Sequence, residues 1–324
     1  MQAVTIEELC SNWRKSIQYG DEIRFHNQEK KHELSQNGIE PHLLSFNELA
    51  TLGSEIGKNI LFAKDSSYIG TDHYLFWTWC SAIILDGLPS PIPNKLYNDP
   101  TLKSLFETCI SSMLTTTPGF YEGLALGKPS YTILSNSNQI CSYIGFPLLE
   151  SLSRFLAADY LTMDGEVIQP FTIPKTDKHP EKEYKKGRCN RLKDSLYLAT
   201  TKITNDHLRE KTASLIRSLD KFSDDNDNGY EYLYELRNSA MHAGVSQQAL
   251  AGTLITIASL LALSLVEAQY DRLAQWSRIN SKFKRHQQDL TNSWCSLYSK
   301  LYSIEICCEY SWYCLDWPVE GQGG

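Results

Sequence analysis

The sequence predicts a mainly α-helical protein, in which a helical bundle is preceded by a mostly helical N-terminal region. Two observations predict this fold class. Apolar residues recur at helical spacing over residues 139–160, and helix-like segments follow one another at short intervals between residues 192 and 277. The chain has 324 residues, 42% of them hydrophobic and 21% charged, which is typical of a folded soluble protein with a sizeable core.

The first part of the chain is expected to form several helices. Residues 5–15 begin with the pattern of a capped first turn, and residues 45–48, Ser-Phe-Asn-Glu, resemble a capping box before a second helix. Residues 74–85 are aromatic and apolar and fit a buried helix or a buried strand. Three alternating prolines at residues 89–93 break the chain, and residues 101–114 return to a helical pattern.

A second unit is predicted from about residue 136. Its first helix carries an apolar stripe made of Ile140, Tyr143, Ile144, Leu148, Leu152, Phe155 and Leu156. Pro147 is expected to kink or restart this helix, and residues 161–190 are expected to form a long connection. Further helices are predicted at about residues 192–200, 206–222, 230–242 and 245–277. The predicted division is an N-terminal region (1–135), a helical domain (136–290) and an aromatic, cysteine-rich C-terminal segment (291–324).

The most informative segment is residues 236–244, Leu-Arg-Asn-Ser-Ala-Met-His-Ala-Gly. Arg237 and Asn238 are followed after three residues by His242, directly before an Ala-Gly helix stop. This pattern resembles the signature motif of the HEPN superfamily, whose domains are small helical bundles. A leading helix similar to residues 146–155 (FPLLESLSRF) precedes the motif, and the resemblance covers roughly residues 136–275.

Many HEPN proteins are metal-independent ribonucleases that act as dimers, often as toxins or in antiviral defence. The resemblance implies that His242 takes the proton of the RNA 2′-hydroxyl, a task suited to histidine near neutral pH. Arg237 would then stabilise the charge that develops on the phosphate, and Asn238 would support the site. The resemblance implies RNA as the partner and no cofactor or metal, and it leaves a sensor or specificity role for the N-terminal region.

Helical geometry adds a condition to this interpretation. On a regular helix over residues 230–242, Arg237 falls within an apolar face, so its guanidinium needs either a structural carboxylate or an anionic ligand such as phosphate. His242 lies about 140° around the same helix from Arg237. The two side chains can act together only if the helix ends before His242 or if two copies of the chain share one site. His242 alone also fits a structural role at a helix C-terminus.

Two further segments carry candidate binding residues. With a net charge of -7, the chain is acidic overall, so any RNA contact must be local. A basic run at residues 178–193 is either a solvated loop or an electrostatic track for RNA. The candidate RNA-binding residues in this run are Lys185, Lys186, Arg188 and Arg191.

Residues 224–235 match the calcium-loop pattern of EF-hands. The side-chain ligands would be Asp224, Asn226, Asn228 and Glu235. Against calcium stand Glu231 at a position that is usually aliphatic, the lack of a second copy, and the preference of any turn for such residues. Cys307, Cys308 and Cys314 could offer thiolates to zinc, but no nearby histidine or CxxC pair completes a site.

The remaining features bear on compartment and class. The nine scattered cysteines and the acidic N-terminus, which does not resemble a secretory leader, favour a reduced protein in the cytoplasm. Residues 243–266 carry no charge and are long enough to span a bilayer, but interspersed Ser and Thr favour a buried core helix. The alternative to a nuclease is a non-catalytic helical protein that binds RNA or mediates dimerisation.

Overall fold

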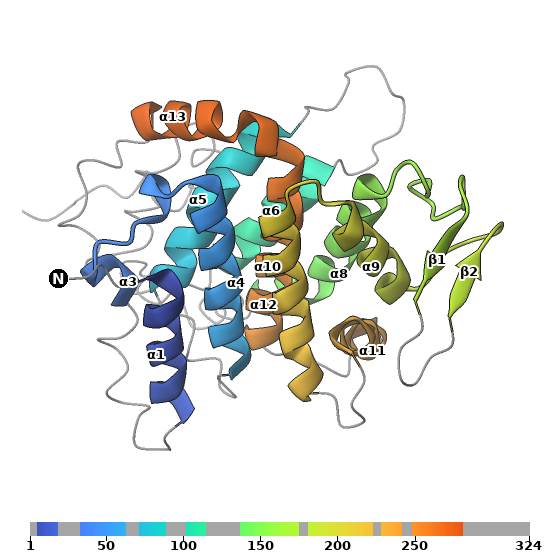
Figure 1. Ribbon diagram of the computed structural model, residues 1–324, viewed down its shortest axis with the longest axis horizontal. Helices are drawn as coiled ribbons and strands as arrows, with labels where there is room; N and C mark the ends of the chain where they lie inside the picture. The colour runs from blue at the N-terminus through green and yellow to red at the C-terminus, as the bar shows by residue number, and fades with distance from the viewer. Residues whose placement is uncertain are drawn as a thin grey trace, which may run out of the picture.

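The computed structural model describes residues 5–18, 33–62, 71–88, 102–114, 137–174, 181–222, 228–241 and 248–280. This part of the chain is mainly helical, as predicted (Figure 1). The first helices are α1 (Ile6–Gln18), α3 (Glu33–Gln36), η2 (Pro41–Leu43), α4 (Phe46–Phe62), α5 (Thr71–Gly87), α6 (Leu102–Leu114) and α8 (Ser137–Leu156). After a short hairpin follow α9 (Leu192–Lys202), α10 (Asp206–Arg217), η4 (Ser218–Phe222), α11 (Gly229–Met241), α12 (Gln248–Val266), η5 (Glu267–Gln269) and α13 (Tyr270–Asn280).

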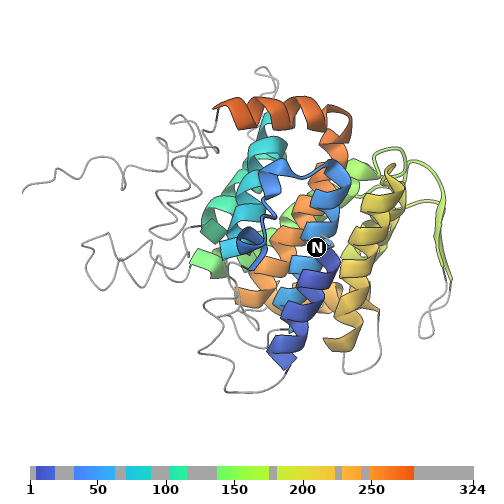
Figure 2. The same ribbon diagram turned by 60° about the vertical axis from the view of Figure 1, so that its left-hand side comes forward.

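Helix α12 is the centre of the bundle (Figure 2). Every residue from Leu250 to Leu263 is buried, and α4, α5, α8 and α10 pack around this helix. Among the described residues, one segment, Leu250–Arg278, is long and apolar enough to cross a membrane, but 83% of its apolar window is buried inside the bundle. The uncharged stretch is therefore a core helix, as the sequence favoured, although residues 243–247 lie outside the described residues.

One continuous hydrophobic core joins the N-terminal helices to the later ones, beside a smaller cluster around the hairpin. Buried side chains from α1 to α13 belong to this core, among them Leu9, Trp77 and Leu254. Across this core, Trp77 Nε1 donates a hydrogen bond of 2.9 Å to Thr256 Oγ1. The predicted boundary at residues 135 and 136 lies outside the described residues, so the division into domains stays a prediction.

The helix starts follow the capping signals in the sequence. At α4 the Ser45 backbone N–H donates to Glu48 Oε2 (2.8 Å), and the Glu48 N–H donates to Ser45 Oγ (3.4 Å), which is the predicted capping box. Hydrogen bonds from Ser45 lower the pKa of Glu48. Thr5 and Glu8 form the same reciprocal pair at α1, at 3.0 and 3.2 Å. Residues 74–85, which fitted a helix or a strand, lie within helix α5.

The predicted connection at residues 161–190 contains an antiparallel hairpin that the sequence did not indicate. Strands β1 (Phe171–Ile173) and β2 (Lys182–Tyr184) pair with Phe171 opposite Tyr184, whose rings stack at 4.8 Å. The hairpin projects from the end of the bundle near α9 (Figure 1). Its strands are three residues long, too short for a period-two pattern to stand out.

Two helix predictions need correction, and a third, for Pro147, is narrowed. Pro147 lies inside α8, which continues through it without restarting. The predicted stripe on α8 is wrong in part, because Ile140, Tyr143 and Phe155 are 49%, 38% and 41% exposed. The segment predicted at 245–277 is not one helix, since η5 separates α12 from α13 and α13 lies across one end of the bundle (Figure 1).

Candidate functional site

Arg237 lies on the last turns of α11 and contacts α8. Its Nε donates a hydrogen bond of 3.1 Å to Glu150 Oε1, and its Nη1 donates one of 3.3 Å to the side-chain oxygen of the adjacent Asn238. The Arg237 side chain is 32% exposed, while Glu150 is 19% exposed. The sequence predicted either a structural carboxylate or an anionic ligand as the partner of this guanidinium, and in the structure the partner is the carboxylate of Glu150. The side chain nevertheless reaches solvent.

Glu150 links Arg237 to a second arginine. Arg154, one helical turn further along α8, has Nη2 at 3.8 Å from Glu150 Oε2, and its Nη1 donates to the Met163 carbonyl at 2.9 Å. Its Nε is buried and has no hydrogen-bond partner in the described part of the chain. One carboxylate between two guanidiniums leaves a net positive charge, which suits an anion.

The sequence did not indicate Glu150 and Arg154 as site residues. Both stand in the segment 146–155 that carries the resemblance on the leading helix, at the spacing of an ion pair within one helix. No spacing rule connects Glu150 to Arg237, which lies 87 positions later in the chain. His242 lies outside the described residues, which extend along α11 to Met241, so the pairing of His242 with Arg237 stays a prediction.

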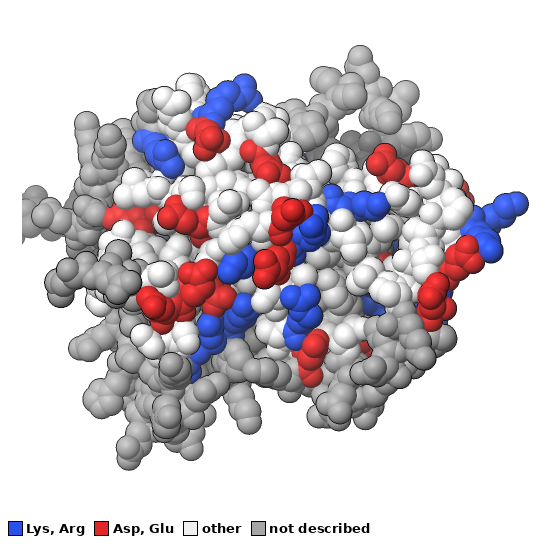
Figure 3. Space-filling model, in the orientation of Figure 1, with Lys and Arg blue, Asp and Glu red and all other residues white. Residues whose placement is uncertain are grey.

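The four candidate RNA-binding residues follow strand β2 of the hairpin, and all are exposed. Lys185 pairs with Glu183 at 2.9 Å, and Arg188 lies 3.6 Å from Glu166. On the face shown in Figure 3, basic and acidic side chains are interspersed rather than segregated. The hairpin therefore carries charges of both signs, and Arg191 differs from the other three by lining a cavity.

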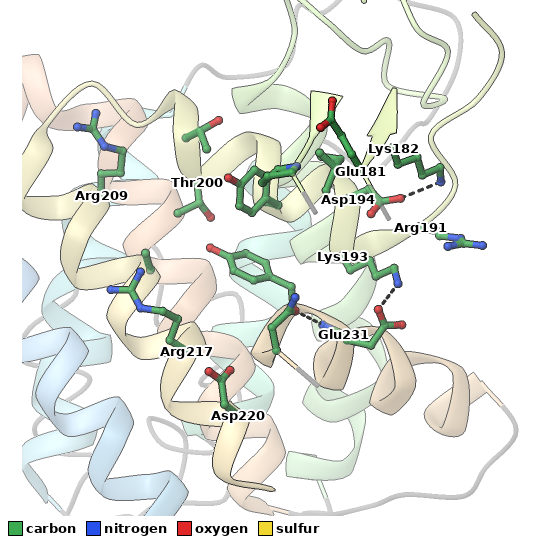
Figure 4. A pocket seen from close by; sticks show the side chains of 17 residues that line it. Glu181, Lys182, Arg191, Lys193, Asp194, Thr200, Arg209, Arg217, Asp220 and Glu231 are labelled. Carbon is green, nitrogen blue, oxygen red and sulfur yellow. Dashed lines mark hydrogen bonds and ion pairs between the residues drawn. The ribbon is translucent and has the colours of Figure 1, made fainter. Parts of the chain in front are cut away.

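That cavity, of about 540 Å³, opens between α9, α10, the start of α11 and the hairpin (Figure 4). Its lining residues come from the hairpin, α9, α10, η4 and the start of α11, which is why the sequence did not indicate it. They are Ile173, Pro174, Glu181, Lys182, Arg191, Lys193, Asp194, Tyr197, Thr200, Thr201, Arg209, Ala213, Arg217, Asp220, Asn228, Tyr230 and Glu231.

Several charged groups of the cavity are buried. Lys193, Asp194 and Glu231 are only 9%, 4% and 8% exposed. Lys193 forms an ion pair with Glu231, and Lys182 lies 3.0 Å from Asp194. Charges are seldom buried unless they are paired, so these two ion pairs satisfy groups that the fold places in the wall of a cavity.

Two tyrosines near these ion pairs stay protonated around neutral pH. Burial, followed by the hydrogen bond to Asp194, raises the pKa of Tyr184 far above its usual value. Burial also raises the pKa of Tyr230. The Lys182 ammonium lies 4.1 Å from the centre of the Tyr184 ring, a cation–π contact that adds to its ion pair with Asp194.

The proposed calcium loop is described only in part. Asn228 Oδ1 accepts a hydrogen bond of 3.0 Å from the Glu231 N–H, so Asn228 acts as the N-cap of α11. Glu235 is exposed on the same helix. Asp224 and Asn226 lie outside the described residues, and within those residues no group of three or more His, Cys, Asp or Glu side chains could hold a metal ion.

Comparisons of the chain with known family models, with curated protein sequences and with solved structures found no match.

Proposed function

We propose that the chain is a metal-independent endoribonuclease of HEPN type, which cuts RNA as a homodimer. The proposal is based on the environment of Arg237. Its Nε donates a hydrogen bond of 3.1 Å to Glu150 Oε1, yet its side chain is 32% exposed to solvent. A guanidinium oriented by a carboxylate through Nε keeps terminal donors for a phosphate oxygen. The nearby Arg154 adds a second positive charge. A toxin or antiviral role in the cytoplasm belongs to the same proposal.

The proposed reaction uses the nucleophile of the RNA itself. His242 takes the proton of the 2′-hydroxyl, whose oxygen forms a bond to the adjacent phosphorus while the bond to the 5′-oxygen breaks. Arg237 stabilises the extra charge on the phosphorane, and Glu150 positions Arg237. The departing 5′-oxygen receives a proton, for which a dimer offers a second histidine. The products are a 2′,3′-cyclic phosphate and a 5′-hydroxyl.

The exposed face of α8 supports a dimer. Ile140, Tyr143 and Pro147 are exposed on this face, and Glu150 and Arg154 continue it at helical spacing. Ile140 is 49% exposed and Tyr143 is 38% exposed, without a covering element in the described part of the chain. A second copy that covered this apolar face would bring its own Arg237 close to the first, as a site shared by two copies of the chain requires.

The test is cleavage of labelled RNA in the presence of a chelator. We expect wild-type protein to cut, and His242→Ala and Arg237→Gln to lose about a hundredfold or more of the rate. Arg272→Gln, which changes an exposed arginine of α13, is the matched control and should cut normally. Cleavage that the chelator abolishes, or that proceeds equally in all four proteins, would refute the proposal.

A second function, a non-catalytic RNA-binding or dimerisation protein, is favoured by one observation. The ion pair between Arg237 and Glu150 is what a purely structural arginine also requires. In that case RNA binds without being cut, and Arg237→Gln lowers the melting temperature as much as Glu150→Gln. A nuclease instead loses cleavage in Arg237→Gln while its melting temperature changes little.

A further inference from the structure

The cavity beside α9 and α10 has the properties of a ligand site. Its volume of about 540 Å³ lies in the range common for small-molecule sites. The buried ion pairs of Lys193 with Glu231 and of Lys182 with Asp194 place both donors and acceptors in its wall. Ligand sites combine a concave shape with a few fixed polar groups, and these two ion pairs supply such groups here.

Two arginines at the cavity have no acidic partner. In the described part of the chain, no carboxylate lies within ion-pair distance of Arg191 or Arg217, and both side chains are exposed. Arg209, by contrast, pairs with Asp206 at 2.5 Å. Arg209 and Arg217 stand two helical turns apart on one face of α10, with the small Ala213 between them, so both reach the same opening. Figure 4 shows these two arginines on one side of the cavity and Lys193 with Glu231 on the other.

Two aromatic rings complete the lining. Tyr197 and Tyr230 pack edge to face with their ring centres 5.6 Å apart, and both are half-buried. Half-exposed tyrosines in a pocket offer a face or an edge to a planar ring. An apolar ligand would form no hydrogen bonds with the buried ion pairs. A simple inorganic anion would make no contact with the tyrosine rings.

We propose that this cavity binds a nucleotide, either free or as one unit of an RNA strand. The base lies against Tyr197 and Tyr230, its polar edge meets Lys193 and Glu231, and the phosphate binds Arg217. Stacking on an aromatic ring and a guanidinium on the phosphate are each strong nucleotide contacts. The inference goes beyond the proposed cleavage and does not depend on it, because binding here requires neither Arg237 nor His242.

The test is titration calorimetry on the full chain with AMP, CMP, GMP, UMP and inorganic phosphate, and with an uncleavable 2′-O-methyl hexanucleotide. We expect saturable binding at one site per chain. Arg217→Gln and Tyr197→Leu should each weaken it about tenfold or more, and Arg272→Gln should leave it unchanged. A circular dichroism spectrum that matches wild type shows that each variant is folded.

Every outcome decides the proposal. If both cavity variants weaken binding of a mononucleotide, the ligand is a free nucleotide. If the chain binds only the hexanucleotide, and both variants weaken that binding, the ligand is a unit of an RNA strand. The proposal is overturned if neither probe binds, if binding is equal in the variants, or if inorganic phosphate binds as tightly as the nucleotides. Loss of cleavage in His242→Ala with nucleotide binding intact separates this site from the proposed nuclease site.

Discussion

Glu150 decides how Arg237 is presented, because its carboxylate lies between two guanidiniums. Arg237 Nε lies 3.1 Å from Glu150 Oε1, and Arg154 Nη2 lies 3.8 Å from Glu150 Oε2. All three side chains are partly exposed to solvent. Partly exposed ion pairs contribute little to stability, while the direction in which they hold a side chain can matter greatly to a reaction. Glu150 is therefore a positioning residue in the proposed site.

Glu150→Gln separates these two contributions. We expect the free energy of unfolding in urea to fall by less than about 1 kcal/mol, since both partners of the main ion pair are partly exposed. The turnover number for RNA cleavage should fall about tenfold, with little change in KM, because Arg237 keeps its charge but loses its fixed direction. A large loss of stability with unchanged turnover would mean that the ion pair is structural.

The sequence predicted single residues of this site but not their partners. Arg237 and Asn238 were predicted because, with His242, they form a short motif, and a short motif can be recognised without knowledge of the fold. Glu150 is 87 positions from Arg237, and the cavity combines residues 173 to 231. Contacts of this range depend on how helices pack, and no periodicity in the chain encodes them.

At the scale of elements, α1 is fastened to α4 by a buried acid. Glu55 Oε2 accepts a hydrogen bond from Arg14 at 2.6 Å, and Lys58 donates to Glu55 Oε1 at 2.7 Å. The Glu55 side chain is 6% exposed. Burial alone would raise the pKa of Glu55, but Lys58 and Arg14 outweigh it and lower the pKa.

Because the pKa of Glu55 is lower in the folded state than in the unfolded state, the free energy of unfolding falls as the pH falls. The stabilisation by Glu55 is complete above the unfolded value of 4.5 and is lost as the pH falls through the lower folded value. We expect Glu55→Gln to lower the free energy of unfolding by about 2 kcal/mol at pH 7, and by less below pH 4. Urea unfolding at several pH values measures this, with Glu7→Gln as the exposed control. A difference that does not shrink at low pH would contradict the role given to Glu55.

Element predictions from the sequence succeeded where a local signal was strong. The capping boxes of α1 and α4 marked helix starts because they need only residues three positions apart. The hairpin was missed because three-residue strands gain stability from the Phe171–Tyr184 contact rather than from a pattern. The break at η5 was missed because its residues, Glu-Ala-Gln, are good helix formers and include no Gly or Pro that would mark the end of a helix.

Glycines let α4 approach the rest of the molecule closely. A Cβ on Gly53 would stand 2.5 Å from Phe76 Cζ of α5 and 2.9 Å from Leu260 Cδ2 of α12. We expect Gly53→Ala to lower the free energy of unfolding by about 1–3 kcal/mol, although alanine favours helices. Thermal melting measures the change, and a gain in stability would show that the core relaxes around the added methyl group.

For the whole molecule, the exposed face of α8 predicts the oligomeric state. Ile140→Glu places a charge on this apolar face at a position 49% exposed in the single chain, so the fold should tolerate it. We expect wild-type protein to behave as a dimer in light scattering, and Ile140→Glu to be a monomer with little RNA cleavage. Ile168→Glu, at a position 56% exposed near the hairpin, is the matched control and should remain a dimer. A wild-type monomer that cuts RNA would contradict the shared site.

The most direct measurement of the proposed chemistry is the structure of the ends left on cut RNA. In the presence of a chelator, wild-type protein should leave a 2′,3′-cyclic phosphate and a 5′-hydroxyl, because the 2′-oxygen is the nucleophile and no metal takes part. Arg237→Gln and His242→Ala should leave the same RNA intact. Ends that carry a 3′-hydroxyl and a 5′-phosphate, or no cutting by the wild-type dimer, would contradict a nuclease site built on Arg237 and His242.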